Sequence, residues 1–180
     1  GHAEHGVEDP HIWLDPNLVK HQAKTIRDGL VLVDPSGTHD YDRNLRAFWS
    51  DLAQVDAEIR QLLAPVRGKT MLVFHPAFGY FADAYGLRQV PIEMEGKEPS
   101  PRQLVQIADQ VRKSGTRVLF SQTQFRALAV EALAGEIGVR VVPLDPLSKD
   151  YLNNLRSMAE RIAWALGAPL PTEEGDRHGK

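Results

Sequence analysis

The chain has 180 residues, of which 42% are hydrophobic and 25% are charged, and its formal net charge is -3 at pH 7. This composition is that of a globular protein long enough to bury a core, and the interspersed charges argue against a nucleic-acid partner and a polybasic membrane surface. The chain contains no cysteine, which excludes disulfides, thiolate nucleophiles and thiolate metal ligands.

A first amphipathic helix is predicted after Asp15. Aspartate followed by Pro16 is a favourable helix start, because the carboxylate can cap the helix and proline fits its first position. Apolar residues then recur at helical spacing from Val19 to Val33. The breaker-rich stretch "DPSGTHD" at 34–40 ends this pattern.

A long helix is predicted over 41–66. Its apolar positions alternate by four and three over three heptads: Tyr41, Leu45, Phe48, Leu52, Val55, Ile59 and Leu62. Such a helix is either a coiled-coil arm or a rigid strut that connects two lobes. The short heptad run and further apolar residues on neighbouring positions favour burial against a protein body.

The remainder of the chain alternates short apolar runs with helical segments. Strands are predicted at Thr70–Phe74, Leu87–Ile92, Arg117–Phe120 and Arg140–Leu144. Helices are predicted to start at Pro76, at a capping box on Ser100, at Phe125 and at Tyr151. This order predicts the α/β class, with a parallel four-stranded sheet covered by helices on both faces.

In such a sheet, ligands bind outside the carboxyl ends of the strands. That edge is expected to carry His75, the loop from Glu93 to Glu98, Gln122 and Asp145. Because cysteine is absent, a metal at this edge must be held by nitrogen and oxygen. Each residue also has a plain structural interpretation, with His75 as a hydrogen-bonded histidine and Asp145 as a turn acid before Pro146.

His11 lies in the stretch "DPHIWLDP" and is either a metal ligand or a loop histidine packed on Trp13. The remaining histidines are expected to be solvated near the chain ends or on helix and loop surfaces: His2, His5, His21, His39 and His178. Glu93, Glu95 and Glu98 could supply a carboxylate, although acids in such a loop are usually solvated. No phosphate loop, nucleophile elbow or zinc-protease motif is present.

Four ordered motifs, "DPHIWLDP", "YDRNLRAFWSDLAQVD", "VFHPAFGYFADAYGL" and "EPSPRQL" with "LDPL", resemble the metal-binding solute-binding proteins of ABC importers, the zinc and manganese class. The resemblance implies two lobes joined by one long helix, with a divalent cation between them. Residues 1–40 would be a remnant of the N-terminal lobe, 41–66 the linking helix and 67–168 the C-terminal α/β lobe. Residues 169–180 are expected to form a mobile tail.

The resemblance implies His11, His75 and Asp145 as metal ligands. Manganese-type members tend to carry Glu at the His75 position, so zinc is the expected metal and manganese the lesser alternative. The family brings a further histidine from a region before the start of this chain. His2, His5, water or a neighbouring chain would then have to complete the site. Glu is expected where this chain has Gln122.

The resemblance therefore implies a component outside the cytoplasm that captures zinc and delivers it to an ABC permease. Its location is expected to be periplasmic or extracellular, with membrane anchoring a further option for the full-length protein. Catalysis is not expected. The alternatives are a metal-dependent hydrolase with Glu93 or Glu95 as base, and a surface adhesin. Self-association through the truncated lobe is expected if residues 17–62 expose an apolar face.

Overall fold

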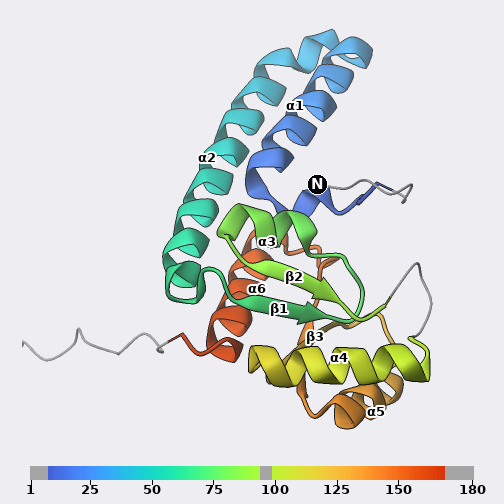
Figure 1. Ribbon diagram of the computed structural model, residues 1–180. Coiled ribbons are helices and arrows are strands. Elements are labelled where there is room, and N and C mark those ends of the chain that lie inside the picture. Colours follow the sequence, from blue (N-terminus) through green and yellow to red (C-terminus); the bar gives the residue numbers. More distant parts are fainter. Residues whose placement is uncertain (1–7, 94–98, 169–180) are drawn as a thin grey trace, which may run out of the picture.

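A computed structural model of the chain describes residues 8–93 and 99–168 (Figure 1). Its first large element is a hairpin of two helices, α1 (Pro16–Val33) and α2 (Thr38–Leu63). The side chain of Asp15 accepts a hydrogen bond from the backbone N–H of Asn17, as the predicted cap requires. The predicted tail at 169–180 lies outside the described residues.

The break between α1 and α2 is shorter than the sequence suggests. Only the turn Pro35–Gly37 separates them, and α2 begins at Thr38 where residue 41 was predicted. The Thr38 hydroxyl donates to the carbonyl of Pro35 at 2.7 Å. This bond joins the first residue of α2 to the first residue of the turn. His39, predicted on a loop or helix surface, therefore lies exposed in the first turn of α2.

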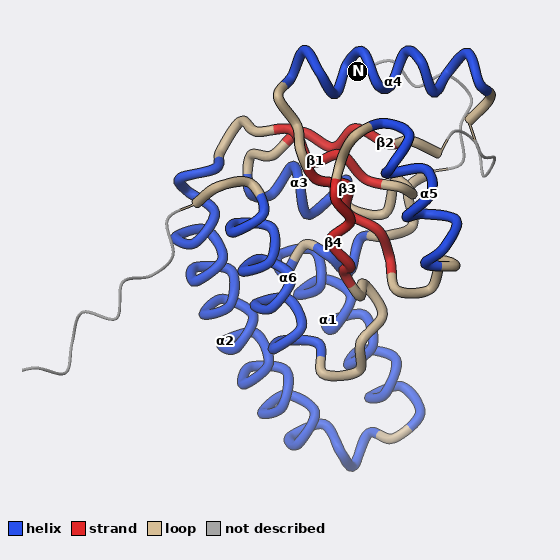
Figure 2. The backbone as a smooth tube through the Cα atoms, turned by 90° about the horizontal axis from the view of Figure 1, so that it is seen from below, coloured by secondary structure: helices blue, strands red, loops and turns tan. Residues whose placement is uncertain are grey.

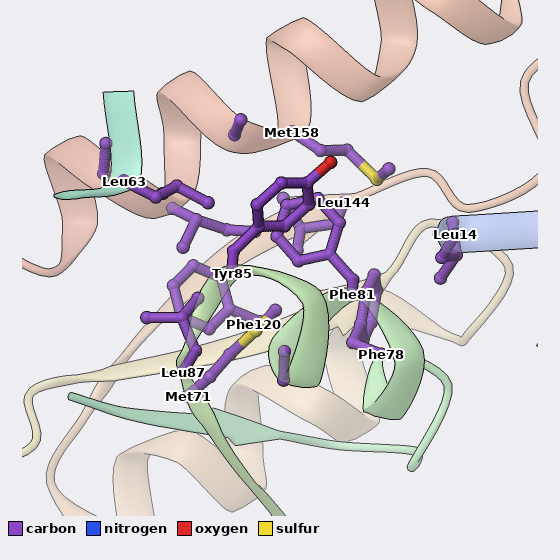
Figure 3. Packing of buried hydrophobic residues seen from close by; sticks show 14 of the residues in the cluster. Leu14, Leu63, Met71, Phe78, Phe81, Tyr85, Leu87, Phe120, Leu144 and Met158 are labelled. Atoms are coloured by element: carbon purple, nitrogen blue, oxygen red, sulfur yellow. The ribbon is translucent and has the colours of Figure 1, made fainter. Parts of the chain in front are cut away.

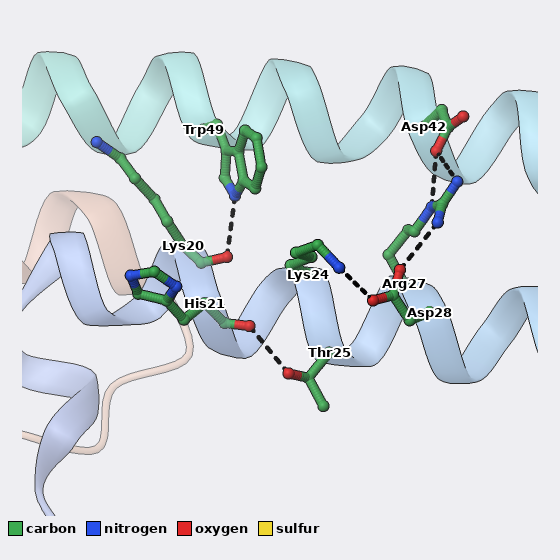
Figure 4. Close-up of polar contacts among 8 residues, drawn as sticks. All are labelled: Lys20, His21, Lys24, Thr25, Arg27, Asp28, Asp42 and Trp49. Carbon is green, nitrogen blue, oxygen red and sulfur yellow. Dashed lines mark hydrogen bonds and ion pairs between the residues drawn. The ribbon is translucent and has the colours of Figure 1, made fainter.

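Polar contacts join α1 to the N-terminal half of α2 (Figure 4). The indole nitrogen of Trp49 donates to the carbonyl of Lys20 at 3.0 Å. The guanidinium of Arg27 reaches Asp42 at 2.5 Å and also pairs with Asp28. These contacts hold α1 against the part of α2 that extends beyond the sheet (Figure 1).

The predicted parallel sheet is confirmed, with strand order β2-β1-β3-β4. The strands are β1 (Thr70–Val73), β2 (Arg88–Pro91), β3 (Val118–Gln122) and β4 (Arg140–Leu144). The connecting helices are α3 (Gly79–Tyr85), α4 (Pro101–Ser114) and α5 (Ala127–Ile137), and α6 (Tyr151–Ala165) follows β4. The capping box predicted at Ser100 and Gln103 is present.

The two faces of the sheet carry separate cores, because successive strand residues point to opposite sides. Met71 and Val73 pack with α2, α3 and α6, whereas Leu72 and Phe74 pack with α4 and α5. Figure 2 shows the sheet between these two helical layers. Phe81 of α3 and Phe120 of β3 are fully buried in the larger core (Figure 3). The packing of both cores against the sheet fixes where the strand ends lie.

Within the described residues, no helix is both long enough and apolar enough to cross a membrane.

Replacing Tyr85 with Phe is expected to make the free energy of unfolding less sensitive to alkaline pH. Burial, reinforced by the nearby Asp56 carboxylate, raises the pKa of Tyr85 above its ordinary value. The unfolded chain therefore ionises this phenol from about pH 10 upward, while the folded chain keeps it neutral. Its contribution to stability is full below about pH 10 and falls above it, by up to about 1.4 kcal/mol per pH unit.

Urea unfolding of the chain and of Tyr85→Phe between about pH 7 and pH 11 measures this effect. The stability difference between the two proteins should stay constant to about pH 9 and then shift in favour of the variant. A difference that stays constant across the whole range would contradict the prediction.

Candidate metal centre

His75 lies where β1 ends, at the carboxyl edge of the sheet. It was predicted to be followed directly by a helix from Pro76, and this was wrong: α3 begins at Gly79. A tight turn intervenes, in which the N–H of Ala77 donates to the carbonyl of His75 at 2.8 Å. The N–H of Phe78 then donates to the side chain of Gln89 on β2. This turn leaves the His75 side chain at the rim, 30% exposed.

The edge contains a point where the strand order reverses. The chain passes from β1 to β2 on one side and returns to β3 on the other. Loops that leave neighbouring strands in opposite directions open a crevice at such a point. The rings of His75 and Phe125, from the loops after β1 and β3, come together here, with their centroids 5.8 Å apart and their planes tilted by 48°.

His11 comes from the segment before α1. The short helix Ile12–Leu14 follows it, and the Leu14 side chain is fully buried in the larger core. The indole nitrogen of Trp13 donates to the carbonyl of Pro146 at 2.9 Å, and the Tyr151 hydroxyl donates to the carbonyl of Trp13 at 2.6 Å. These bonds tie the His11 segment to the loop after β4 and to α6.

The structure brings His11 and His75 together. Their ring centroids lie 5.5 Å apart with an interplanar angle of 78°. Two imidazoles bound to one tetrahedral zinc through Zn–N bonds of about 2 Å place their centroids roughly 5 Å apart. The pair therefore has a separation that suits two nitrogen ligands of a single zinc ion.

Each imidazole also contacts a carboxylate through its Nδ1 atom. Nδ1 of His75 lies 2.6 Å from Oε2 of Glu93, and Nδ1 of His11 lies 2.6 Å from Oδ1 of Asp9. Trp13 packs edge-on against His11, with the ring centroids 5.2 Å apart. His11 therefore has the predicted contact with Trp13 and also lies beside His75. In both rings the carboxylate contacts Nδ1, so Nε2 is not used in this contact.

Asp9 was not among the sequence candidates. Its Oδ1 also accepts the backbone N–H of His11 at 2.9 Å, which is the usual turn formed by an aspartate two residues before the donor. The spacing Asp-x-His in "DPHIW" is the signal that could have identified it.

Asp145 lies at the same edge, directly after β4. Its Oδ1 accepts hydrogen bonds from the Gln124 side chain at 2.8 Å and from the N–H of Leu147 at 3.0 Å. Within residues 8–93 and 99–168, no three His, Asp or Glu side chains are grouped closely enough to hold a metal ion. The structure does not join Asp145 to the His11–His75 pair, and its role as a ligand stays a prediction.

The other candidates are distributed as follows. His21 is exposed on α1, and Gln122 ends β3 beside Leu144. The residues His2, His5, Glu95, Glu98 and His178 lie outside the described part of the chain. Glu93, the one described candidate for a hydrolase base, is bound to Nδ1 of His75. Because Nε2 is the nitrogen left for a metal, this position does not suit a base that must reach a metal-bound water.

Solved structures with the same fold define the class of protein. A crystal structure of ZnuA has a TM-score of 0.84 and 44% identity, covering 89% of this chain and 63% of that one. A Streptococcus agalactiae laminin-binding protein, described as having adhesin and metal-transporting activity, has a TM-score of 0.79 and 34% identity over 88% of this chain and 64% of that one. The fold is that of the ZnuA-type solute-binding proteins, the class expected from the sequence.

The chain belongs to the ZnuA family, described as zinc-uptake complex component A, periplasmic, whose model matches residues 1–165. The high-affinity zinc uptake system protein ZnuA of Yersinia pestis is 37% identical over 171 residues, which are 90% of this chain and 54% of that protein. The Bacillus subtilis protein of the same name is 31% identical over 77% of this chain and 44% of its own length. The chain thus spans about half the length of the curated relatives it matches.

Proposed function

We propose that this chain is the zinc-binding part of a solute-binding protein that delivers zinc to the permease of an ABC importer. The observation that carries the proposal is the His11–His75 pair, 5.5 Å apart at the sheet edge. Two imidazoles suit zinc better than manganese. Membership of a family described as a zinc-uptake component supports the same cargo, and a solved ZnuA relative is described with zinc bound.

The proposal places the protein outside the cytoplasm, in the periplasm or at the cell surface, with membrane anchoring as part of the proposal for the full-length protein. It also assigns residues 41–66, most of which belong to α2, as the link between the lobe at 67–168 and a second lobe, of which residues 1–40 are a part. Support comes from the 26-residue length of α2, about 39 Å at 1.5 Å per residue, and from the greater length of the relatives.

Zinc is cargo in this proposal and catalysis is not part of it. The carboxylates of Asp9 and Glu93 contact Nδ1 of His11 and His75, and this supports a role in orienting the two rings over a role as a catalytic base. A carrier needs a site that fills and empties, and the 30% exposure of the His75 side chain at the rim supports such a site. The adhesin alternative rests on the descriptions of laminin-binding structural relatives, whereas metal capture is also supported by the imidazole pair.

Replacing Asp145 with Asn is expected to weaken zinc binding. Loss of a residue that only orients a ligand typically costs about 10- to 100-fold in metal affinity, so loss of a charged ligand should cost at least as much. Competitive titration of zinc against a chromophoric chelator measures the change. Asp150→Asn is the matched control, because Asp150 is an exposed acid in the same segment. Equal affinity of both variants and the unmodified chain would remove Asp145 from the ligand set.

We infer that a second copy of this chain is a further binding partner. The open sides of α1 and α2 form an apolar groove whose lining residues are Ala23, Ile26, Arg27, Leu30, Tyr41, Asn44, Leu45 and Phe48. Ile26 is 64% exposed and Leu30 is 40% exposed, so a second copy that covers the groove removes apolar surface from water.

The 180-residue chain is therefore expected to elute from a sizing column nearer to twice its mass as its concentration rises. Ile26→Lys should shift the elution back toward the monomer, because a charge in the groove would have to be buried. Leu128→Lys, on exposed α5 surface away from the groove, is the control. A mass that does not depend on concentration would overturn the inference.

A further inference from the structure

Both histidines of the pair meet an acid at the same ring atom, and the two acids come from different parts of the chain. We propose that Asp9 and Glu93 are positioning residues that fix His11 and His75 as Nδ1-protonated imidazoles, so that both offer Nε2 to zinc. The proposal rests on the proposed function for its metal, but the protonation state of each ring is a property of the metal-free chain.

The Glu93 contact is the more enclosed of the two. Its side chain is only 11% exposed, and its backbone N–H donates to the carbonyl of Phe74 at 2.8 Å, which fixes the residue just beyond β2. An ionised carboxylate can only accept hydrogen bonds. At a separation of 2.6 Å from Oε2, Nδ1 of His75 must therefore carry the proton when the ring is neutral.

The Asp9 contact is held from two sides. Oδ1 accepts both the backbone N–H and Nδ1 of His11, at 2.9 and 2.6 Å. Oδ2 lies 2.8 Å from the point where a Cβ atom would sit on Gly79, the first residue of α3. A glycine at this position thus leaves room for the Asp9 carboxylate, and a Cβ atom there would force that carboxylate to shift.

The two contacts have the same chemical consequence for metal binding. A ligand histidine binds through the nitrogen that lacks a proton, and the bond made by the other nitrogen decides which one that is. An acceptor on Nδ1 also makes Nε2 a stronger donor to the metal. The ring orientation is settled before zinc arrives, so binding does not have to select one rotamer and one tautomer from several.

The test is a measurement of imidazole tautomers by NMR in the metal-free chain labelled with nitrogen-15, at a mildly alkaline pH where an ordinary imidazole is neutral. His11 and His75 are both expected to be protonated at Nδ1. Glu93→Gln should release the tautomer of His75 and leave His11 unchanged, because a neutral amide can donate as well as accept. Gly79→Ala should do the reverse, through displacement of Asp9.

Each variant therefore carries its own folding control in the histidine that it should not affect. Zinc affinity is expected to fall by about 10- to 100-fold in either variant, as is typical when such a partner is lost. Glu131→Gln, an exposed acid on α5, is the matched control and should change neither the tautomers nor the affinity.

An Nε2-protonated His75 in the unmodified chain would overturn the proposal, as would a Glu93→Gln variant with unchanged tautomer and affinity. If that variant has no effect while zinc still binds tightly to the unmodified chain, the proposed function stands and the positioning role fails. If the tautomers are as expected but the unmodified chain binds no zinc, the tautomer assignment is supported and the proposed function is overturned.

Discussion

The His75→Ala variant is expected to bind zinc more than about 100-fold more weakly than the unmodified chain, because loss of a ligand should exceed the 10- to 100-fold cost of losing a residue that supports one. His75 is one of the two proposed nitrogen ligands, and its ring centroid lies 5.5 Å from that of His11. With the ring removed, one imidazole from His11 remains, and Glu93 is left with a nearly buried carboxylate that has lost its 2.6 Å partner.

Competitive titration at neutral pH measures this loss, and His11→Ala should behave in the same way. His21→Ala is the matched control, because it removes an exposed histidine from α1 and should leave the affinity unchanged. Unchanged affinity in both His11→Ala and His75→Ala would mean that the two histidines are structural and that zinc, if bound, lies elsewhere.

The Phe81→Ala variant is expected to lose about 3 to 5 kcal/mol of unfolding free energy, as large-to-small changes of buried phenylalanines do. Phe81 is completely buried in α3, and its ring packs edge-on against that of Tyr85 at 4.7 Å (Figure 3). The cost combines lost apolar burial with a cavity that the surrounding helices and sheet can fill only in part.

Urea unfolding of the two proteins measures this difference, provided that the slope with denaturant is unchanged. Leu128→Ala on α5 is the control, because Leu128 is 82% exposed and should alter stability by no more than about 0.5 kcal/mol. A loss below about 1 kcal/mol for Phe81→Ala would mean that the core around α3 is not packed as described.

The strands and helices were predictable because their apolar residues repeat with the period of each element. The predicted runs Thr70–Phe74 and Arg117–Phe120 became neighbouring strands of one parallel sheet, as the alternation with helices required. The start of α3 at Gly79 could not be predicted from the periodicity of apolar residues. It depends on the bond between Phe78 and Gln89, which forms only when β2 lies beside β1.

Some features of the candidate site were predictable from the sequence, and others depend on the fold. The edge position of His75 follows from its place after a strand, and the choice of His11 came from resemblance to a family. The contact between His75 and Glu93 joins residues 18 positions apart and depends on the fold, so no local pattern indicates it. Whether Asp145 completes the ligand set remains a prediction, because its described bonds are those of a turn acid.

The bonds of Trp13 also bear on the order of events during folding. They join residue 13 to residues 146 and 151, which are 133 and 138 positions further along the chain. Contacts between such distant residues form late, since the loop between them must first be closed. The segment that carries His11 is therefore expected to settle beside His75 only after the loop after β4 and the start of α6 are in place. Zinc capture would then report that the whole lobe has folded.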